Sequence, residues 1–414
     1  MKRVLVLFFV ALLVMALNPV RAQEKLQVYI TGLPESGLEW FRNEAFPAFQ
    51  ATYGSDVTLE IITGGWGDFD ATVAGWITTG SGPDIVYLGS EYAATYGDLL
   101  KDVSAYFTEE DLAAFLPAAL ETASWDGALR GMPLLMSPRP IYYRTDLFAE
   151  GSEIPLTFAD ALEFVRANSI VEDNAMVQMG FMDIGSGLFD AQEFIAYIWS
   201  AGGELYYEDG SSAFDSEATA EALQYMYDRR RIILPTESTA GLPPFEGYPI
   251  ASGRVVSGIF PLWNMPPTTD PLWENIAIAP YPAGENGSPV VQVFIDWLSV
   301  PQYVPDEKLG LVTDFLKFIT SQENAIALSN VVGFTPVRVD AWDSLRANPV
   351  WNTLLDLTVE YGRGFSDIRA SAELRPLIVE QVTLFLTDQQ SLEDTLQNLK
   401  DEYDAILQEN GYLD

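Results

Sequence analysis

The sequence predicts an α/β fold made of two lobes. Between residues 26 and 88, short apolar runs alternate with stretches of helical spacing, which gives the order β-α-β-α-β. This order is typical of a parallel sheet covered by helices. The chain has 414 residues, and because single domains usually hold about 100–200 residues, we expect two lobes.

Apolar spacing, Gly and Pro define the elements of the first part of the chain. Residues 26–30 alternate like a strand, and a helix with apolar residues from 38 to 53 follows and stops at Gly54. Pro47 lies inside this helix and should kink it. Residues 57–62 form a second strand, the next helix ends near Gly80, and residues 84–88 form a third strand.

The later elements are recognised mainly by their caps. Thr157 and Asp160 form a capping-box-like start for a helix that reaches Asn168. Ser391 caps the last helix, whose apolar residues between 392 and 406 keep a spacing of three to four. Between these two helices the sequence predicts a helix over 191–201, a helix starting at Asp215 or Ser216, and strands over 255–260 and 290–300.

The first 22 residues have the pattern of an export signal. Lys2 and Arg3 precede an apolar run over residues 4–17, which is shorter than the ~20 residues that a spanning helix needs. We expect cleavage after Ala22. Because the chain contains no Cys, it lacks the residue that carries the lipid of a bacterial lipoprotein, so we expect a freely diffusing periplasmic protein.

The composition excludes several kinds of function. The chain has 59 Asp and Glu against 22 Lys and Arg, a formal net charge of −37. Such a surface repels nucleic acid and anionic lipid, so we expect neither as a partner. The chain has no Cys and no His, which removes thiolate nucleophiles, Ser-His-Asp triads and the usual zinc sites. Catalysis would have to rest on carboxylates, Lys or Tyr; we expect no metal and no cofactor, and we assign no catalytic residues.

The segment 81–92, Ser-Gly-Pro-Asp-Ile-Val-Tyr-Leu-Gly-Ser-Glu-Tyr, is the most informative motif. Its apolar run is bounded by Gly82-Pro83 and Gly89-Ser90, which predicts a buried strand that ends in an irregular loop. In open α/β sheets, ligands bind beyond the carboxyl ends of the strands. The loop places Glu91 there. Taken alone, the segment favours the simpler interpretation, in which Asp84 caps a turn and Glu91 is a solvated surface residue.

This segment resembles a motif of the extracellular solute-binding proteins of ABC importers, in the sugar-binding class often called family 1. Further segments resemble the family in the same order from about residue 26 to residue 410. They include Tyr142-Tyr-Arg-Thr-Asp-Leu-Phe148, Gly202-Gly203, Phe214-Asp-Ser-Glu-Ala218, residues 251–264, 278–284, 315–321 and 333–338. The chain departs from the family at Arg144 and Thr145, which replace Asn-Lys, and at residues 294–297, which replace a Gly-Gly start.

The resemblance implies a two-lobed periplasmic binding protein of type II-like fold. Each lobe would be a mainly parallel sheet flanked by helices, with the ligand in the cleft between lobes. The implied N-terminal lobe is 23–137 plus 295–338, and the C-terminal lobe is 138–294 plus 339–414. The resemblance further implies a monomer that binds a sugar or small oligosaccharide and delivers it to permease subunits in the inner membrane.

A sugar offers apolar C–H faces and hydroxyl groups, so its site needs aromatic rings beside carboxylate, amide or guanidinium groups. Trp66, between glycines in the loop after the second strand, lacks a packed scaffold and is a predicted contact. Asp68 is either a contact or the N-cap of the next helix. Glu91 is the predicted contact of the third loop, whereas the neighbouring Tyr92 is expected to pack.

Four further contacts are predicted in the second half of the chain. Trp263 and Asn264 follow the strand over 255–260, and Trp263 is the strongest aromatic candidate. Asp296 and Trp297 lie in an apolar strand, where the Asp needs a partner, either the ligand or a hinge hydrogen bond. Trp199, Trp273 and Trp351 are expected to be structural.

Arg139, between two prolines near the first crossover, has two interpretations. It is either a surface ion pair with one of the many acids, which we favour, or a ligand clamp. The alternatives to sugar transport are the same fold with a polyamine or sugar acid as cargo, and a secreted glycoside hydrolase that uses Asp68, Glu91 or Asp296.

Overall fold

The computed structural model describes residues 24–54, 57–173, 175–183, 189–233 and 247–413. The predicted export signal over 1–22 lies outside the described residues. Within these ranges, no helix combines the length and the apolar character that crossing a membrane requires.

The strands have the following bounds: β1 Glu24–Thr31, β2 Val57–Gly64, β3 Ile85–Leu88, β4 Ser124–Trp125, β5 Ala128–Leu129, β6 Gly131–Arg139, β7 Ile141–Arg144, β8 Ile170–Glu172, β9 Ala175–Gln178, β10 Ser257–Ile259, β11 Ile276–Ala279, β12 Val291–Ser299, β13 Thr335–Pro336 and β14 Gly362–Arg363.

The α-helices have the following bounds: α1 Glu35–Trp40, α2 Phe46–Tyr53, α3 Phe69–Thr79, α4 Tyr92–Tyr96, α5 Glu109–Leu112, α6 Pro117–Thr122, α7 Phe158–Asn168, α8 Ala191–Ser200, α9 Glu217–Ile233, α10 Leu309–Ile319, α11 Gln322–Val332, α12 Trp342–Leu345, α13 Pro349–Tyr361, α14 Ser371–Leu386 and α15 Leu392–Glu409.

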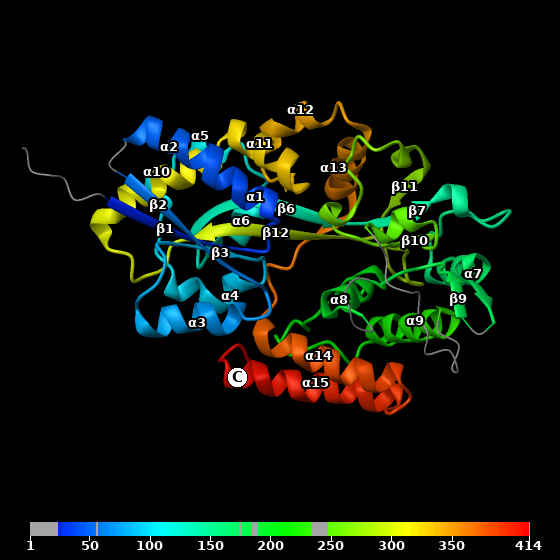
Figure 1. The fold of residues 1–414 in the computed structure, drawn as a ribbon. Helices are drawn as coiled ribbons and strands as arrows, with labels where there is room; N and C mark the ends of the chain where they lie inside the picture. Colours follow the sequence, from blue (N-terminus) through cyan, green and yellow to red (C-terminus); the bar gives the residue numbers. More distant parts are fainter. Residues whose placement is uncertain (1–23, 55–56, 174, 184–188, 234–246, 414) are drawn as a thin grey trace, which may run out of the picture.

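The largest sheet has the order β13-β6-β12-β3-β1-β2, with β14 beside β12. β1 runs parallel to β2 and β3, which confirms the predicted β-α-β-α-β start. β12 is antiparallel to both β3 and β6. The sheet is therefore mixed, whereas we expected mainly parallel sheets. The reason is that β6 and β12 carry the chain between the two halves of the molecule in opposite directions and pair with each other (Figure 1).

A second sheet, β10-β7-β11, is antiparallel throughout. It lies at the far end of β6 and β12 (Figure 1). The two-lobed α/β class is confirmed, but the second lobe departs from the mainly parallel sheet that we expected.

Separate apolar cores define the two lobes. One core joins β1–β3 and β6 to β12, α10 and α11. We call the elements around this core the N-terminal lobe. A second core joins α7, α8 and α9 to α14 and α15, and a smaller third core surrounds Tyr142 and Trp351. We call the elements around the second and third cores the C-terminal lobe. Both cores of this lobe draw on residues before 294 and after 339. The first core also takes in Trp342 and Leu355, and the division of the chain between the lobes stays a prediction.

Local sequence signals explain several element ends. The helix expected to kink at Pro47 is α1 and α2 joined by a π-helical turn, Phe41–Ala45, and Pro47 lies in the first turn of α2. A proline removes one backbone donor, which a change of helical register accommodates. α3 ends at Gly80, which is left-handed with φ 63°. The capping box of Thr157 and Asp160 is present at the start of α7.

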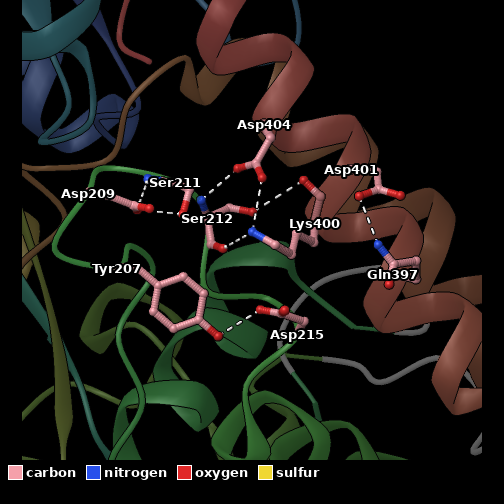
Figure 2. A network of polar contacts seen from close by, with 9 residues as sticks. All are labelled: Tyr207, Asp209, Ser211, Ser212, Asp215, Gln397, Lys400, Asp401 and Asp404. Atoms are coloured by element: carbon pink, nitrogen blue, oxygen red, sulfur yellow. Dashed lines mark hydrogen bonds and ion pairs between the residues drawn. The ribbon is translucent and has the colours of Figure 1, made fainter. Parts of the chain in front are cut away.

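The last helix, α15, is fixed to the C-terminal lobe by a polar network (Figure 2). Lys400 donates to the Ser212 carbonyl and to Asp404, both at 3.0 Å. Asp404 also accepts from the Ser212 N–H at 2.6 Å. Because Ser212 is fully buried, these bonds attach the polar edge of α15 to the interior of the lobe.

Candidate ligand-binding site

A cavity of 220 Å³ lies between the lobes. It lies beyond the carboxyl ends of β1, β2 and β3, where an α/β sheet places its ligands. β6 and β12 form its floor, and the start of α8 and the helix α14 close it from the C-terminal lobe. Its lining residues are Gly32, Trp66, Gly89, Glu91, Ser137, Arg139, Asp190, Gln192, Trp263, Phe294, Asp296, Phe334 and Arg375.

Five of the eight residues predicted from the sequence lie together in this lining. They are Trp66, Glu91, Arg139, Trp263 and Asp296. They come from five separate segments of the chain. Their convergence in one cavity is a finding, whereas ligand contact by each of them stays a prediction.

The other three predicted residues do not line the cavity. Asp68 occupies the N-cap position of α3, although its side chain makes no capping hydrogen bond. Asn264 ends a short 3₁₀ turn, Leu262–Asn264, and is half-buried. Trp297 is fully buried, and its Nε1 donates to the Gly89 carbonyl at 3.0 Å. Trp297 therefore supports the loop after β3 from behind.

Glu91 is one of two carboxylates that the N-terminal lobe places in the cavity, and it is only 6% exposed. Its Oε1 accepts from Gln192 Nε2 at 3.2 Å and lies 3.6 Å from Arg375. Both partners belong to the C-terminal lobe, so Glu91 joins the lobes directly. Burial raises the pKa of the Glu91 carboxyl, while the charges of Arg375 and Arg139 act in the opposite direction.

Asp296 projects from β12 into the same cavity and is 8% exposed. Burial raises the pKa of its carboxyl to about 7. The negative charge of Glu91 adds to this rise, and the Tyr87 hydroxyl and the Arg139 charge oppose it. Asp296 therefore exchanges a proton near neutral pH and can both accept and donate hydrogen bonds in the cavity.

Arg139 lies at the end of β6 with its guanidinium 3.9 Å from the centre of the Phe294 ring. Its Nε is buried without a hydrogen-bond partner. No carboxylate among the described residues lies within ion-pair distance of it, so the surface ion pair that we favoured from the sequence is wrong. Burial lowers the pKa of Arg139, and Asp190, Asp296 and Glu91 counteract that effect. Its donors are thus held in place and unpaired.

Two tryptophans offer exposed ring surface at the cavity. Trp66 is 41% exposed and Trp263 is 37% exposed. Trp66 packs over Phe69, with ring centres 5.0 Å apart. Trp263 stacks on Phe334 at 4.6 Å with an angle of 13° between the rings. Phe334 therefore covers one face of Trp263, the Arg139 guanidinium lies 5.9 Å from the ring centre, and the ring surface that stays exposed is open to a ligand.

Sequence reasoning found Trp263 but missed Asp190, Gln192 and Arg375, which the C-terminal lobe also contributes. Asp190 caps α8 by accepting from the Gln192 N–H, and both residues line the cavity. Their only sequence signal is a cap, which almost any helix shows. Arg375 lies within α14 and has no local signal at all. Among the described residues, no group of three or more acidic side chains is placed to hold a metal ion.

A family model described as bacterial extracellular solute-binding protein matches residues 44–352. Two curated relatives are arabinooligosaccharide-binding proteins, one from Halalkalibacterium halodurans and one from Bacillus subtilis, each 24% identical to this chain. The first alignment covers 65% of this chain and 60% of the relative, and the second covers 57% and 55%. The chain thus spans little more than half the length of these relatives.

Solved structures show the same fold. Maltose-bound MalE3 of T. maritima superposes with a TM-score of 0.78 and 22% identity, covering 92% of this chain and all of the other. The maltotriose-bound maltotriose-binding protein of Thermus thermophilus gives 0.72 and 16%, with the same coverage. With three quarters of its length inside the family model, this chain belongs to the bacterial extracellular solute-binding protein family.

Proposed function

We propose that this protein is the non-catalytic substrate-binding component of an ABC importer and that its cargo is a sugar or small oligosaccharide. The observation that carries the proposal is the composition of the interlobe cavity. Exposed tryptophan rings stand beside buried carboxylate, guanidinium and amide groups in a space of 220 Å³. This is the combination that a polyhydroxylated ligand with apolar ring faces requires.

Each type of group has a distinct task in this proposal. Trp66 and the open face of Trp263 cover the C–H faces of the sugar ring. Glu91, Asp296 and Gln192 accept from hydroxyls or donate to them. Arg139 donates to hydroxyl oxygens with the groups that the protein leaves unpaired, and stacking on Phe294 holds it without an ion pair.

The lobes supply the mechanism of capture. The cavity is walled by residues of both lobes, so a ligand inside it is released only when the lobes separate. Glu91 bonds to Gln192 and lies beside Arg375 across the cleft. A sugar hydroxyl that reaches Glu91 adds a third bond to the same carboxylate and thereby stabilises the closed arrangement.

The names of the relatives agree with a sugar cargo. They are binding proteins for arabino-oligosaccharides, and the structural neighbours hold maltose or maltotriose. These similarities do not favour a polyamine, a sugar acid or glycoside hydrolysis. We further propose export by a cleaved signal over residues 1–22, release into the periplasm as a monomer without a lipid anchor, and delivery of the cargo to permease subunits.

A thermal-shift screen of mono- and oligosaccharides, with polyamines and sugar acids as competing classes, tests the proposal. A ligand that binds only the folded protein raises its stability by RT ln(1 + [L]/Kd). We expect stabilisation by one sugar series, confirmed by calorimetry, and recovery of the sugar unchanged after incubation. A response confined to polyamines, or release of shortened sugars, contradicts it.

A further inference from the structure

We propose that the cargo is a chain of at least two sugar units, because a second cavity continues the site beyond Trp263. This proposal rests on the proposed function. The second cavity, called the outer groove here, has a volume of 500 Å³. It is lined by Pro34, Ser36, Tyr248, Leu262, Trp263, Met265, Pro266, Pro267, Thr268, Thr269, Asn330, Val331, Val332, Gly333 and Trp351. Trp263 lines both cavities, so the two spaces adjoin at this indole.

The outer groove, like the inner cavity, lies between the lobes. Pro34 and Ser36 at the start of α1, with the end of α11, form its wall on the N-terminal lobe. The segment from Leu262 to Thr269 and the third apolar core form the opposite wall. Closure of the lobes therefore encloses both spaces at once, and a ligand that fills both is held along its length.

The volumes of the two spaces favour a chain of sugar units over a single sugar. Cavities that bury small-molecule ligands usually have about 300–1,000 Å³. The inner cavity alone, at 220 Å³, falls below this range. Together with the outer groove it lies well inside the range. A monosaccharide in the inner cavity would leave the larger of the two spaces to water.

The chemistry of the outer groove indicates what occupies it. None of the described residues that line it is charged, although the chain carries 59 acidic residues. Tyr248, Trp263 and three prolines offer apolar faces, and Ser36, Thr268, Thr269 and Asn330 offer hydroxyl and amide groups. Neutral sugar units need this mixture. A cationic polyamine would find no carboxylate there, and its buried charges would remain unpaired.

Hydrogen bonds within the protein hold the groove in shape. Trp273 Nε1 donates to the carbonyls of Pro266 and Pro267 at 3.2 and 3.0 Å. Ser36 Oγ donates to the Val331 carbonyl at 3.3 Å on the facing wall. Trp273, which we expected to be structural, thus supports the wall of the groove. A groove that is already formed binds further sugar units without a large ordering cost.

The charged groups are confined to the inner cavity, so the two spaces have different tasks. Glu91, Arg139 and Asp296 select the hydroxyl pattern of the first sugar unit through charge-assisted hydrogen bonds. The outer groove adds affinity for the second and later units through ring faces and neutral polar groups. Affinity should therefore depend on the identity of the inner unit and on the length of the chain beyond it.

Calorimetry with two series of probes tests the proposal: 1,5-α-linked arabinose and 1,4-α-linked glucose oligomers of one to four units. In the series that binds, we expect Kd to fall at least tenfold from one unit to two or three. Asn330→Arg and Thr269→Arg place a long cation in the groove at exposed positions. Each should weaken oligomer binding at least tenfold and change monosaccharide binding less than twofold.

Asn330 lies in the last turn of α11, where a cation is compatible with the helix dipole, so the variant should fold. Gln408→Arg, at an exposed position of α15, is the matched control and should change neither affinity. If the monosaccharide binds as tightly as its trimer, or both groove variants keep full oligomer affinity, the groove proposal is overturned and the proposed function stands. If no member of either series binds and no sugar of the thermal-shift screen stabilises the protein, both are rejected.

Discussion

The Ser90 hydroxyl bonds to both backbone groups of Ile295, accepting from its N–H at 2.7 Å and donating to its carbonyl at 3.0 Å. Trp297 Nε1 adds a bond to the Gly89 carbonyl at 3.0 Å. These three bonds fix the loop that carries Glu91 onto the strand that carries Asp296. The two carboxylates of the cavity therefore share one rigid support, although about 200 residues separate them in the chain.

Ser90→Ala tests this support. It leaves the buried Ile295 N–H without its partner, so the free energy of unfolding should fall by about 1–3 kcal/mol. Because the loop loses its attachment, sugar affinity should also fall, by roughly tenfold. Urea unfolding and calorimetry measure the two effects separately.

Ser299→Ala is the matched control for Ser90→Ala. Ser299 is equally buried on the same strand, and its Oγ donates to the Val86 carbonyl at 2.8 Å, away from the cavity lining. The Ser299→Ala variant should lose folding stability and keep its affinity for the sugar. Equal affinities in the two variants would show that Ser90 acts only on stability.

Trp263→Ala and Trp66→Ala test stacking. If these rings cover the sugar faces, each replacement should cost about 2–4 kcal/mol of binding free energy, since ring anchors of this kind dominate binding. Titration calorimetry with the sugar found in the screen gives the value. Tyr106→Ala, at a ring that is 38% exposed elsewhere, should leave binding unchanged. Unchanged binding in both Trp variants would remove stacking from the proposal.

Glu91→Gln should weaken ligand binding and raise the folding stability of the ligand-free protein. The amide keeps the size of the side chain but loses the charge-assisted bonds, so we expect roughly a tenfold to hundredfold loss of affinity. Because burial raises the pKa of Glu91, its ionised form is unfavourable in the folded state, and the variant should unfold at a higher urea concentration at pH 8. Glu110→Gln, at an exposed position of α5, should do neither. A simultaneous loss of stability and affinity would indicate a structural role instead.

The sequence signals predicted features that depend on residues close together in the chain. They missed features that depend on contacts between segments far apart in the chain. Gly80, Thr157 and Asp160 mark helix ends because their effects are local. The mixed sheet was not predictable, since the pairing of β12 with β3 and β6 joins segments far apart in the chain. Arg375 reaches Glu91 only because α14 packs across the cleft, and nothing within its own helix indicates that.

Alternation along β12 explains the contrast between Asp296 and Trp297. Successive side chains of a strand point to opposite faces. Phe294 and Asp296 line the cavity, whereas Ile295 and Trp297 belong to the core behind it. We predicted both Asp296 and Trp297 as ligand contacts, but a strand places only alternate residues on one face. Because side chains alternate along a strand, the sequence could have identified which of the two residues faces the cavity once the face of one of them was known.

The stability of the ligand-free protein should fall as pH rises from about 4 to about 7, partly because of Asp296. The pKa of its carboxyl is about 7 in the folded protein and about 4 in an unfolded chain. Between these values the folded state keeps a proton that the unfolded state has lost, so the free energy of unfolding decreases with pH. Above pH 7 both states are ionised and the contribution becomes constant.

Asp296→Asn removes this contribution, so the variant should gain stability relative to the parent across that window and keep the gain above it. The full effect is on the order of a few kcal/mol. Urea unfolding at pH 4, 5, 6, 7 and 8 measures it. The raised pKa of Glu91 acts in the same direction, so the variant keeps a smaller slope of its own. For the control Asp343→Asn, at an exposed position of α12, the curve of unfolding free energy against pH should run parallel to that of the parent. A parallel curve for Asp296→Asn would mean that Asp296 is ionised throughout this pH range.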